Sequence, residues 1–188
     1  AQMFDVGTLL AHQPLPAGKR VAIVGNSTAI GWLVADAVLD QGLELASEEP
    51  VDIGTRGTPE DFRAALQEAV DDDGVDAVVA VFLPPLMSGS QEFGPALREV
   101  ARLSAKPIAA SFLSTEGIPP ELAVLDADGM PARGSVPSYS TPERAVISLA
   151  KVSEYAHWRR RPVGEVPELP DVDEDAGRAL VRAVLADE

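Results

Sequence analysis

Residues 21–31, Val21-Ala22-Ile23-Val24-Gly25-Asn26-Ser27-Thr28-Ala29-Ile30-Gly31, predict a β-strand that turns sharply into an α-helix. Four consecutive apolar residues between turn residues are typical of a strand covered on both faces of a parallel sheet. The chain then continues to residue 41 with apolar side chains at helical spacing and stops at Gly42, a common residue after a helix. A strand that leads through a short turn into a helix is the repeating unit of α/β proteins.

The same alternation continues along the chain. Thr58-Pro59-Glu60 and Thr141-Pro142-Glu143 each begin a helix, because threonine caps it, proline fits its first position and glutamate favours its positive end. Further strands are expected at residues 43–46, 51–53, 75–83 and 107–112, and further helices at 93–103 and up to about residue 160. Strands joined by helices through right-handed crossovers form a mainly parallel sheet with helices on both faces.

The remaining segments divide the chain. Residues 3–12 have helical spacing and are expected to form an N-terminal docking helix, and residues 114–133 are irregular except for a helical turn near 121–125. Residues 136–139 are expected to form a short edge strand, where proline is tolerated. We therefore predict one domain over residues 1–162, an acidic, proline-containing linker over 163–173, and a C-terminal helix over 174–188 that leads to a further domain.

Charge and composition exclude several classes of function. The 188 residues contain 30 acidic and 15 basic side chains, a formal net charge of −15, so there is no basic surface for nucleic acid. The longest apolar run, Ala77 to Leu83, is far shorter than the roughly 20 residues of a membrane span. With no cysteine and two histidines, a thiolate nucleophile and a Cys- or His-rich metal site are excluded. We expect no nucleic-acid partner, no membrane contact, no bound metal, and a cytoplasmic location.

The turn after the first strand is the candidate anion site. In an open parallel sheet, ligands bind beyond the carboxyl ends of the strands. The free N–H groups and positive end of the following helix could hold a phosphate there without any basic side chain. The candidate phosphate-binding residues are Asn26, Ser27, Thr28, Ala29 and Gly31. The turn lacks the lysine of a Walker loop and the middle glycine of the dinucleotide fingerprint. The alternative is a tight turn with Ser27 or Thr28 as N-cap and no ligand.

Asp52 is a candidate secondary contact. It follows a short strand and is expected on the same edge of the sheet as the turn, where it would contact a ligand or cap a helix. His12 and His157 have no nucleophile partner, and there is no G-x-S-x-G elbow, no H-E-x-x-H motif and no hydrolase triad. We therefore assign no catalytic residue within this chain.

Several stretches, taken in order, resemble a known family. They are Leu9–Pro16, Arg20–Ser27, Pro50–Asp52, Gly74–Val78, Lys106–Ala110, Pro137–Tyr139 with Thr141–Ala145, and Tyr155–Pro162. Together they resemble the CoA-ligase domain of NDP-forming acyl-CoA synthetases, which are relatives of succinyl-CoA synthetase. The resemblance extends from about Phe4 to Pro170 and rests on the ordered set, since no single stretch is specific.

The resemblance implies a flavodoxin-like three-layer α/β domain and a role in a larger enzyme. Members join a CoA-binding domain, a flavodoxin-like domain with a phosphorylatable histidine, a second flavodoxin-like domain and an ATP-grasp domain, and this chain looks like the second flavodoxin-like domain. The family reaction forms acyl-CoA from a carboxylate, CoA and ATP. CoA, ATP or ADP, phosphate and Mg would act in the complete enzyme, which would also be compatible with a homo-oligomer. No cofactor is expected to bind this chain directly, and the chain alone is expected to be inactive.

In the family, the phosphohistidine loop lies between two helix N-termini, and residues 26–31 match the second of them. Thr28 and Ala29 stand where the family usually has glycines, and Glu49 stands where it usually has asparagine. This departure leaves two alternatives. One is a non-catalytic ligand-sensing or regulatory domain of a GNAT-type protein acetyltransferase. The other is a free-standing flavodoxin-like module without an anion site.

Overall fold

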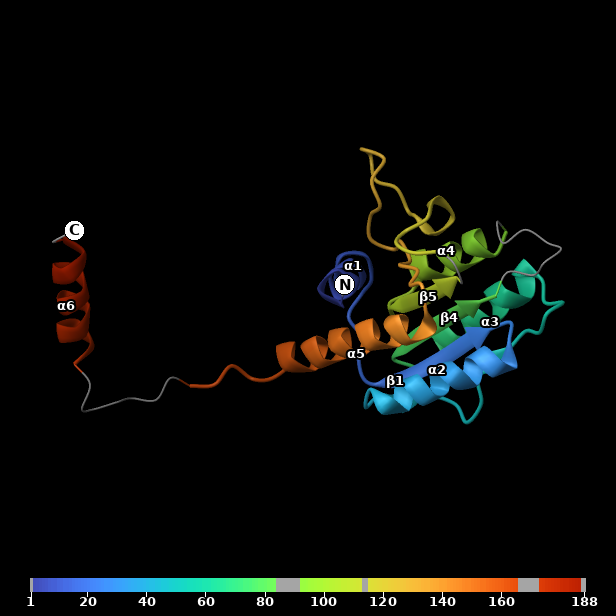
Figure 1. Cartoon of the computed structure of the whole chain (residues 1–188), viewed down its shortest axis with the longest axis horizontal. Helices are drawn as coiled ribbons and strands as arrows, with labels where there is room; N and C mark the ends of the chain where they lie inside the picture. The colour runs from blue at the N-terminus through green and yellow to red at the C-terminus, as the bar shows by residue number, and fades with distance from the viewer. Residues whose placement is uncertain (1, 84–91, 113–114, 166–172, 187–188) are drawn as a thin grey trace.

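A parallel sheet forms the centre of the computed structural model, which describes residues 2–83, 92–112, 115–165 and 173–186 (Figure 1). The strands are β1 (Arg20–Gly25), β2 (Glu44–Leu45), β3 (Val51–Asp52), β4 (Ala77–Phe82) and β5 (Ile108–Phe112). Their order is β2-β1-β4-β5, and β3 pairs with the end of β1 beyond β2. All of these pairs are parallel, so the carboxyl ends of the strands meet at one edge.

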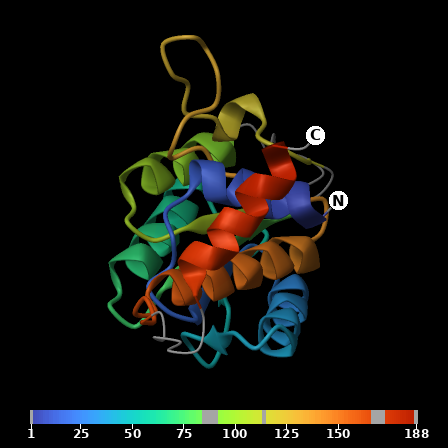
Figure 2. The same cartoon turned by 90° about the vertical axis from the view of Figure 1, so that its left-hand side faces the viewer.

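Helices cover both faces of this sheet. α1 (Gln2–His12), α2 (Thr28–Asp40) and α5 (Pro142–Arg159) lie on one face, and α3 (Pro59–Asp71) and α4 (Phe93–Leu103) lie on the other (Figures 1 and 2). A short 3₁₀ helix, η2 (Pro120–Leu122), packs near α4, and α6 (Glu174–Ala186) is the last element. The predicted α/β class and flavodoxin-like three-layer architecture are confirmed. Among the described residues, no helix is both long and apolar enough to cross a membrane.

The core under α3 and α4 is aromatic. Four phenylalanines, Phe62, Phe82, Phe93 and Phe112, are buried there, and the Phe82 and Phe93 ring centroids lie 4.3 Å apart. Phe62 makes an edge-on contact with Phe93 at 5.9 Å. Aromatic pairs at such distances contribute about 0.5–1.5 kcal/mol beyond their buried area. This cluster fixes α3 and α4 against β4 and β5.

The core on the opposite face of the sheet packs α1 against α5. Leu9 of α1 is buried among residues of the sheet and of α5, including Leu149. Asp5 accepts hydrogen bonds from the guanidinium of Arg144 at 2.7 and 2.9 Å, and its carbonyl accepts one from the Tyr139 hydroxyl at 3.0 Å. Gln13 is buried, donating to the Ser135 carbonyl and accepting from the Ile108 amide. The N-terminal helix is therefore an integral part of the fold.

Arg20 and Asp76 form an ion pair at the amino edge of the sheet. The Arg20 guanidinium at the start of β1 donates to both carboxylate oxygens of Asp76, at 3.0 and 3.1 Å, and the Arg20 amide donates to the same carboxylate. Gly18 leaves room for this pair, because a Cβ atom at that position would lie 2.3 Å from Asp76 Oδ2. Hydrogen bonding from Arg20 holds the pKa of Asp76 below its usual value.

One sequence prediction is wrong. Residues 136–139 do not form a strand; Ser138 instead makes isolated bridges to Ala110 and to Gly117. The physical reason is that Pro137 has no N–H to donate and its neighbour Ser138 exchanges backbone hydrogen bonds with Gly117.

The predicted helical turn near 121–125 lies at Pro120–Leu122. Part of the predicted linker, residues 166–172, lies outside the described residues, so the division at 162 stays a prediction.

Candidate functional site

The turn between β1 and α2 lies at the carboxyl edge of the sheet, as the sequence predicts. Asn26 is the first residue after β1 and is buried. Its side-chain amide nitrogen donates to the Leu83 carbonyl, and its side-chain oxygen accepts from the Leu83 amide, each at 2.8 Å. Asn26 therefore ties the end of β1 to the end of β4. These two bonds hold the buried side chain against Leu83 and leave only one N–H of its amide group, so its role at the site is to position the turn.

The N-terminus of α2 is open. Ser27 is its N-cap residue, but the Ser27 side chain makes no capping hydrogen bond, and the Gly31 amide donates to the Ser27 carbonyl at 2.9 Å. For the amides of Thr28, Ala29 and Ile30, no acceptor is found within the part of the chain that the structure describes. Thr28 and Ala29 are exposed. These three N–H groups and the positive end of the helix are thus available to an anion.

Two other helices of the same domain start differently. At α3, the Thr58 hydroxyl accepts from the Asp61 amide while the Asp61 carboxylate accepts from the Thr58 amide, which is a complete capping box. At α5, the Thr141 hydroxyl accepts from the Arg144 amide. The open start of α2 is therefore not a general property of this fold.

Thr28 and Asp52 lie side by side at this edge. The Thr28 hydroxyl donates to Asp52 Oδ2, and Asp52 Oδ1 accepts from the Gly54 amide at 2.7 Å. Asp52 reaches this place because β3 pairs with the end of β1, with Asp52 opposite Gly25. The only hydroxyl proton of Thr28 is therefore used, and the Asp52 carboxylate puts a negative charge beside the positive end of α2.

Gly31 has a packing role. A Cβ atom at this position would lie 2.9 Å from the Pro50 Cβ atom, so glycine lets α2 pass close to the segment before β3. The structure thus brings together all of the predicted site residues, Asn26, Ser27, Thr28, Ala29, Gly31 and Asp52. At the start of α2, the backbone amides of residues 28–30 and the Ser27 hydroxyl have no acceptor among the described residues, and the buried Asn26 side chain keeps one N–H. No local sequence pattern indicates the Asn26–Leu83 contact, whose partners lie 57 residues apart.

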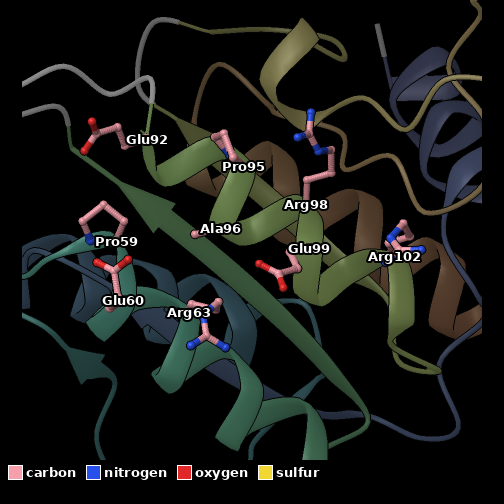
Figure 3. Close-up of a pocket in the computed structure, with 9 residues that line it drawn as sticks. All are labelled: Pro59, Glu60, Arg63, Glu92, Pro95, Ala96, Arg98, Glu99 and Arg102. Carbon is pink, nitrogen blue, oxygen red and sulfur yellow. The ribbon is translucent and has the colours of Figure 1, made fainter.

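A separate groove lies between α3 and α4 (Figure 3). Its volume is about 490 Å³, and its charged lining residues are Glu60, Arg63, Glu92, Arg98, Glu99 and Arg102. No sequence pattern pointed to it. Three acidic and three basic side chains line the groove, so their formal charges cancel. Across the described ranges, no cluster of three His, Cys, Asp or Glu side chains has the arrangement of a metal site.

Comparison with known proteins gives named relatives. The chain is 30% identical over 183 residues to the acetate–CoA ligase [ADP-forming] II of Archaeoglobus fulgidus, covering 84% of this chain and 26% of that protein. It is 27% identical over 154 residues to the acetate–CoA ligase [ADP-forming] II subunit alpha of Pyrococcus furiosus, covering 70% of this chain and 32% of that subunit. The chain thus spans about a third or less of these relatives. No family model matches.

A solved structure shows the same fold. The dinucleotide-forming acetyl-coenzyme A synthetase 1 of Ca. Korarchaeum cryptofilum, in complex with phosphate and ADP, aligns with a TM-score of 0.67 at 19% identity, covering 84% of this chain and 37% of that one. At this identity the match establishes the fold. The sequence relatives, in turn, confirm the predicted resemblance to NDP-forming acyl-CoA synthetases.

Proposed function

We propose that this chain, a relative of the ADP-forming acetate–CoA ligases, is the CoA-ligase module of a larger acyl-CoA synthetase. In this proposal the N-terminus of α2 holds the phosphoryl group of a phosphohistidine that another domain of the enzyme supplies. The complete enzyme is an acid–thiol ligase that forms acyl-CoA from a carboxylate, CoA and ATP. CoA, the nucleotide and Mg bind the partner domains, and this chain alone does not complete the reaction.

The observation that carries the proposal is the open start of α2. A phosphoryl group in transfer spreads negative charge over its oxygens, and backbone amides that already point at those oxygens stabilise this charge without reorganising. The amides of Thr28, Ala29 and Ile30 supply such donors at the carboxyl edge of the sheet, where ligands of parallel sheets bind. The capped helices α3 and α5 have no equivalent group of free amides.

The neighbouring residues have different roles in this proposal. Asn26 sets the position of the turn through Leu83, and the Ser27 hydroxyl, which makes no capping bond, is a side-chain donor next to the open amides in the chain. Asp52 and Thr28 bond to each other. The Asp52 carboxylate weakens anion binding at this end of α2, so the site suits a phosphoryl group delivered by a partner domain better than free phosphate in solution.

The test is a titration of the chain with inorganic phosphate, followed by the backbone amide resonances in NMR spectra. The amides of residues 28–30 are expected to shift together, whereas those of Glu60 and Asp61 at the capped start of α3 stay in place. Shifts of the same size at both helices, or none at α2, would refute an anion site at the turn.

A charge placed at the turn gives an independent test. Ala29→Glu introduces a carboxylate at the exposed start of α2, where it competes for the same amides, and is expected to abolish the phosphate-dependent shifts. Ala64→Glu, an equally exposed alanine on α3, is the matched control and is expected to leave them unchanged. If both variants lose the shifts equally, total charge governs them and the proposal fails.

A further inference from the structure

The C-terminal helix α6 has an apolar face that none of the described residues covers. Every residue from Glu174 to Ala186 is exposed, and α6 stands apart from the sheet domain (Figure 1). Its charged side chains, Glu174, Asp175, Arg178 and Arg182, fall on one side at helical spacing, and the opposite side is apolar. Its two central apolar residues, Leu180 and Val184, are 70% and 62% exposed. A helix of this length is marginally stable in water without tertiary packing, so α6 needs a binding surface.

The seam between α1 and α5 offers such a surface. One hollow of about 530 Å³ is lined by Met3, Val6 and Leu10 beside Lys151. A second hollow of about 440 Å³ is lined by Leu10, Pro14 and Leu15, with Arg133 and Arg159 at its charged end. The two hollows share Leu10 and follow each other along the seam, and we call them together the α1–α5 trough.

The apolar residues of α6 have the same spacing along the helix as those of α1 in the trough. Met3, Val6 and Leu10 repeat at the helical spacing of Gly177, Leu180 and Val184 on α6. Both faces also contain a glycine, Gly7 in the trough and Gly177 on α6, and a Cβ atom at either position would meet no atom within 4 Å. A mid-helix glycine costs about 1 kcal/mol relative to alanine, and no contact in the domain accounts for either one. Close approach of two helix backbones accounts for both.

Charged residues at one end of the trough determine the direction in which α6 fits it. Arg133 and Arg159 form no ion pair with any residue that the structure describes; Arg133 contacts the Gln13 carbonyl and the Arg159 guanidinium lies 5.9 Å from the Tyr155 ring centroid. The chain enters α6 through Asp173-Glu174-Asp175. Opposite charges meet when this acidic end lies at the arginine end of the trough. Val184 then lies near Met3.

We propose that α6 docks in the α1–α5 trough of its own chain, with its apolar face inward and its acidic end toward Arg133 and Arg159. The connection between Arg159 and Glu174 is long enough, since that number of residues spans up to about 45 Å. The connection can also reach the far end of the trough, because Lys151 lies only about 12 Å from Arg159 along the axis of α5. This docking is independent of the anion site at the start of α2.

Engineered disulfides test the docking directly, because the chain contains no cysteine. In the full chain, Met3→Cys with Val184→Cys is expected to form a disulfide within one molecule under mild oxidation. Met3→Cys with Arg182→Cys, which places the second thiol on the charged side of α6, is the matched control and is expected to react at least tenfold more slowly. Equal rates for the two pairs, or a disulfide that forms only between two molecules, would overturn docking within the chain.

Hydrogen exchange gives a second readout without new thiols. Gly7→Trp fills the trough while leaving α1 intact, because nothing lies within 4 Å of the Gly7 position. The amides of residues 178–186 are expected to exchange at least tenfold faster in Gly7→Trp than in the wild type, with protection in β4 unchanged. If α6 exchanges at the same rate in the variant and the wild type, the proposal is wrong.

Discussion

The side-chain amide of Asn26 bonds to both backbone groups of Leu83, its nitrogen to the carbonyl and its oxygen to the amide, each at 2.8 Å. The contact links the residues that directly follow two adjacent parallel strands, β1 and β4, just where the sheet ends. It replaces the ladder hydrogen bonds that the strands no longer form beyond Gly25 and Phe82. The open turn at the start of α2 is therefore built on a fixed strand end.

We expect Asn26→Ala to destabilise the domain by about 1–3 kcal/mol, because both Leu83 backbone groups lose their partner at a largely buried position. Urea unfolding followed by circular dichroism measures the change. Ser47→Ala is the control, since it removes one hydrogen bond at an exposed loop and is expected to cost less than about 0.5 kcal/mol. Similar losses for the two variants would contradict this role for Asn26.

Asp52→Asn is expected to tighten phosphate binding at the start of α2 by roughly two- to fivefold, because it removes a negative charge beside the helix N-terminus. Asp72→Asn is a close control. Asp72 accepts from the amide two residues ahead at 2.7 Å, as Asp52 does, but it lies at the opposite edge of the sheet. The dissociation constant comes from the amide titration. An equal gain from Asp72→Asn would mean that net charge alone explains the effect.

The Arg20–Asp76 pair gives a pH-dependent contribution to stability. Hydrogen bonding from Arg20 lowers the pKa of Asp76 below its model-peptide value of 3.8, so the folded state binds this proton less tightly than the unfolded state. The contribution is therefore complete above about pH 4 and is lost as the pH falls through the folded-state pKa. The difference in urea midpoint between the wild type and Asp76→Asn should be largest near pH 7 and should shrink toward pH 3. A difference that does not change with pH would show that packing, not charge, is lost.

Two glycines in helices are expected to respond oppositely to alanine. At Gly31, the new Cβ atom would lie 2.9 Å from Pro50, so Gly31→Ala should destabilise the domain by about 1–3 kcal/mol. At Gly7 there is nothing within 4 Å, so Gly7→Ala should stabilise it by up to about 1 kcal/mol through helix propensity. Thermal unfolding of the two variants measures both effects. A loss of stability in Gly7→Ala would contradict this expectation and would show that position 7 needs glycine, as close approach of a second helix would require.

Features that depend on local sequence were predicted well. The starts of α3 and α5 follow from a threonine, a proline and an acidic residue in succession, and the structure has a threonine cap at each. The apolar runs of β1, β4 and β5 are buried throughout, apart from Arg20. These patterns act over a few residues, so the chain alone specifies them.

Features that depend on distant partners were not predicted. Asn26 was expected to donate to a ligand, but Leu83 takes both ends of its side chain. Gly31 was predicted to bind phosphate. In the structure, a Cβ atom at this position would lie closest to Pro50, which only the pairing of β3 with β1 brings there. Anion binding at residues 27–31 and at Asp52 stays a prediction, as does the division into domain, linker and C-terminal helix. The contacts of Asn26 with Leu83 and of Gly31 with Pro50 join residues far apart in the sequence, so no local pattern predicts them.

The bonds from Asp5 to Arg144 and Tyr139 and from Gln13 to Ser135 have a consequence for biosynthesis. During synthesis, α1 leaves the ribosome before the rest of this domain, and its partners are made more than 120 residues later. Until then its apolar side has no native surface to cover it, while the strands and crossover helices between can already assemble in order. α1 is therefore translated before its partners and reaches its native place only after they are made, so the nascent domain keeps an exposed apolar helix until α1 packs onto α5.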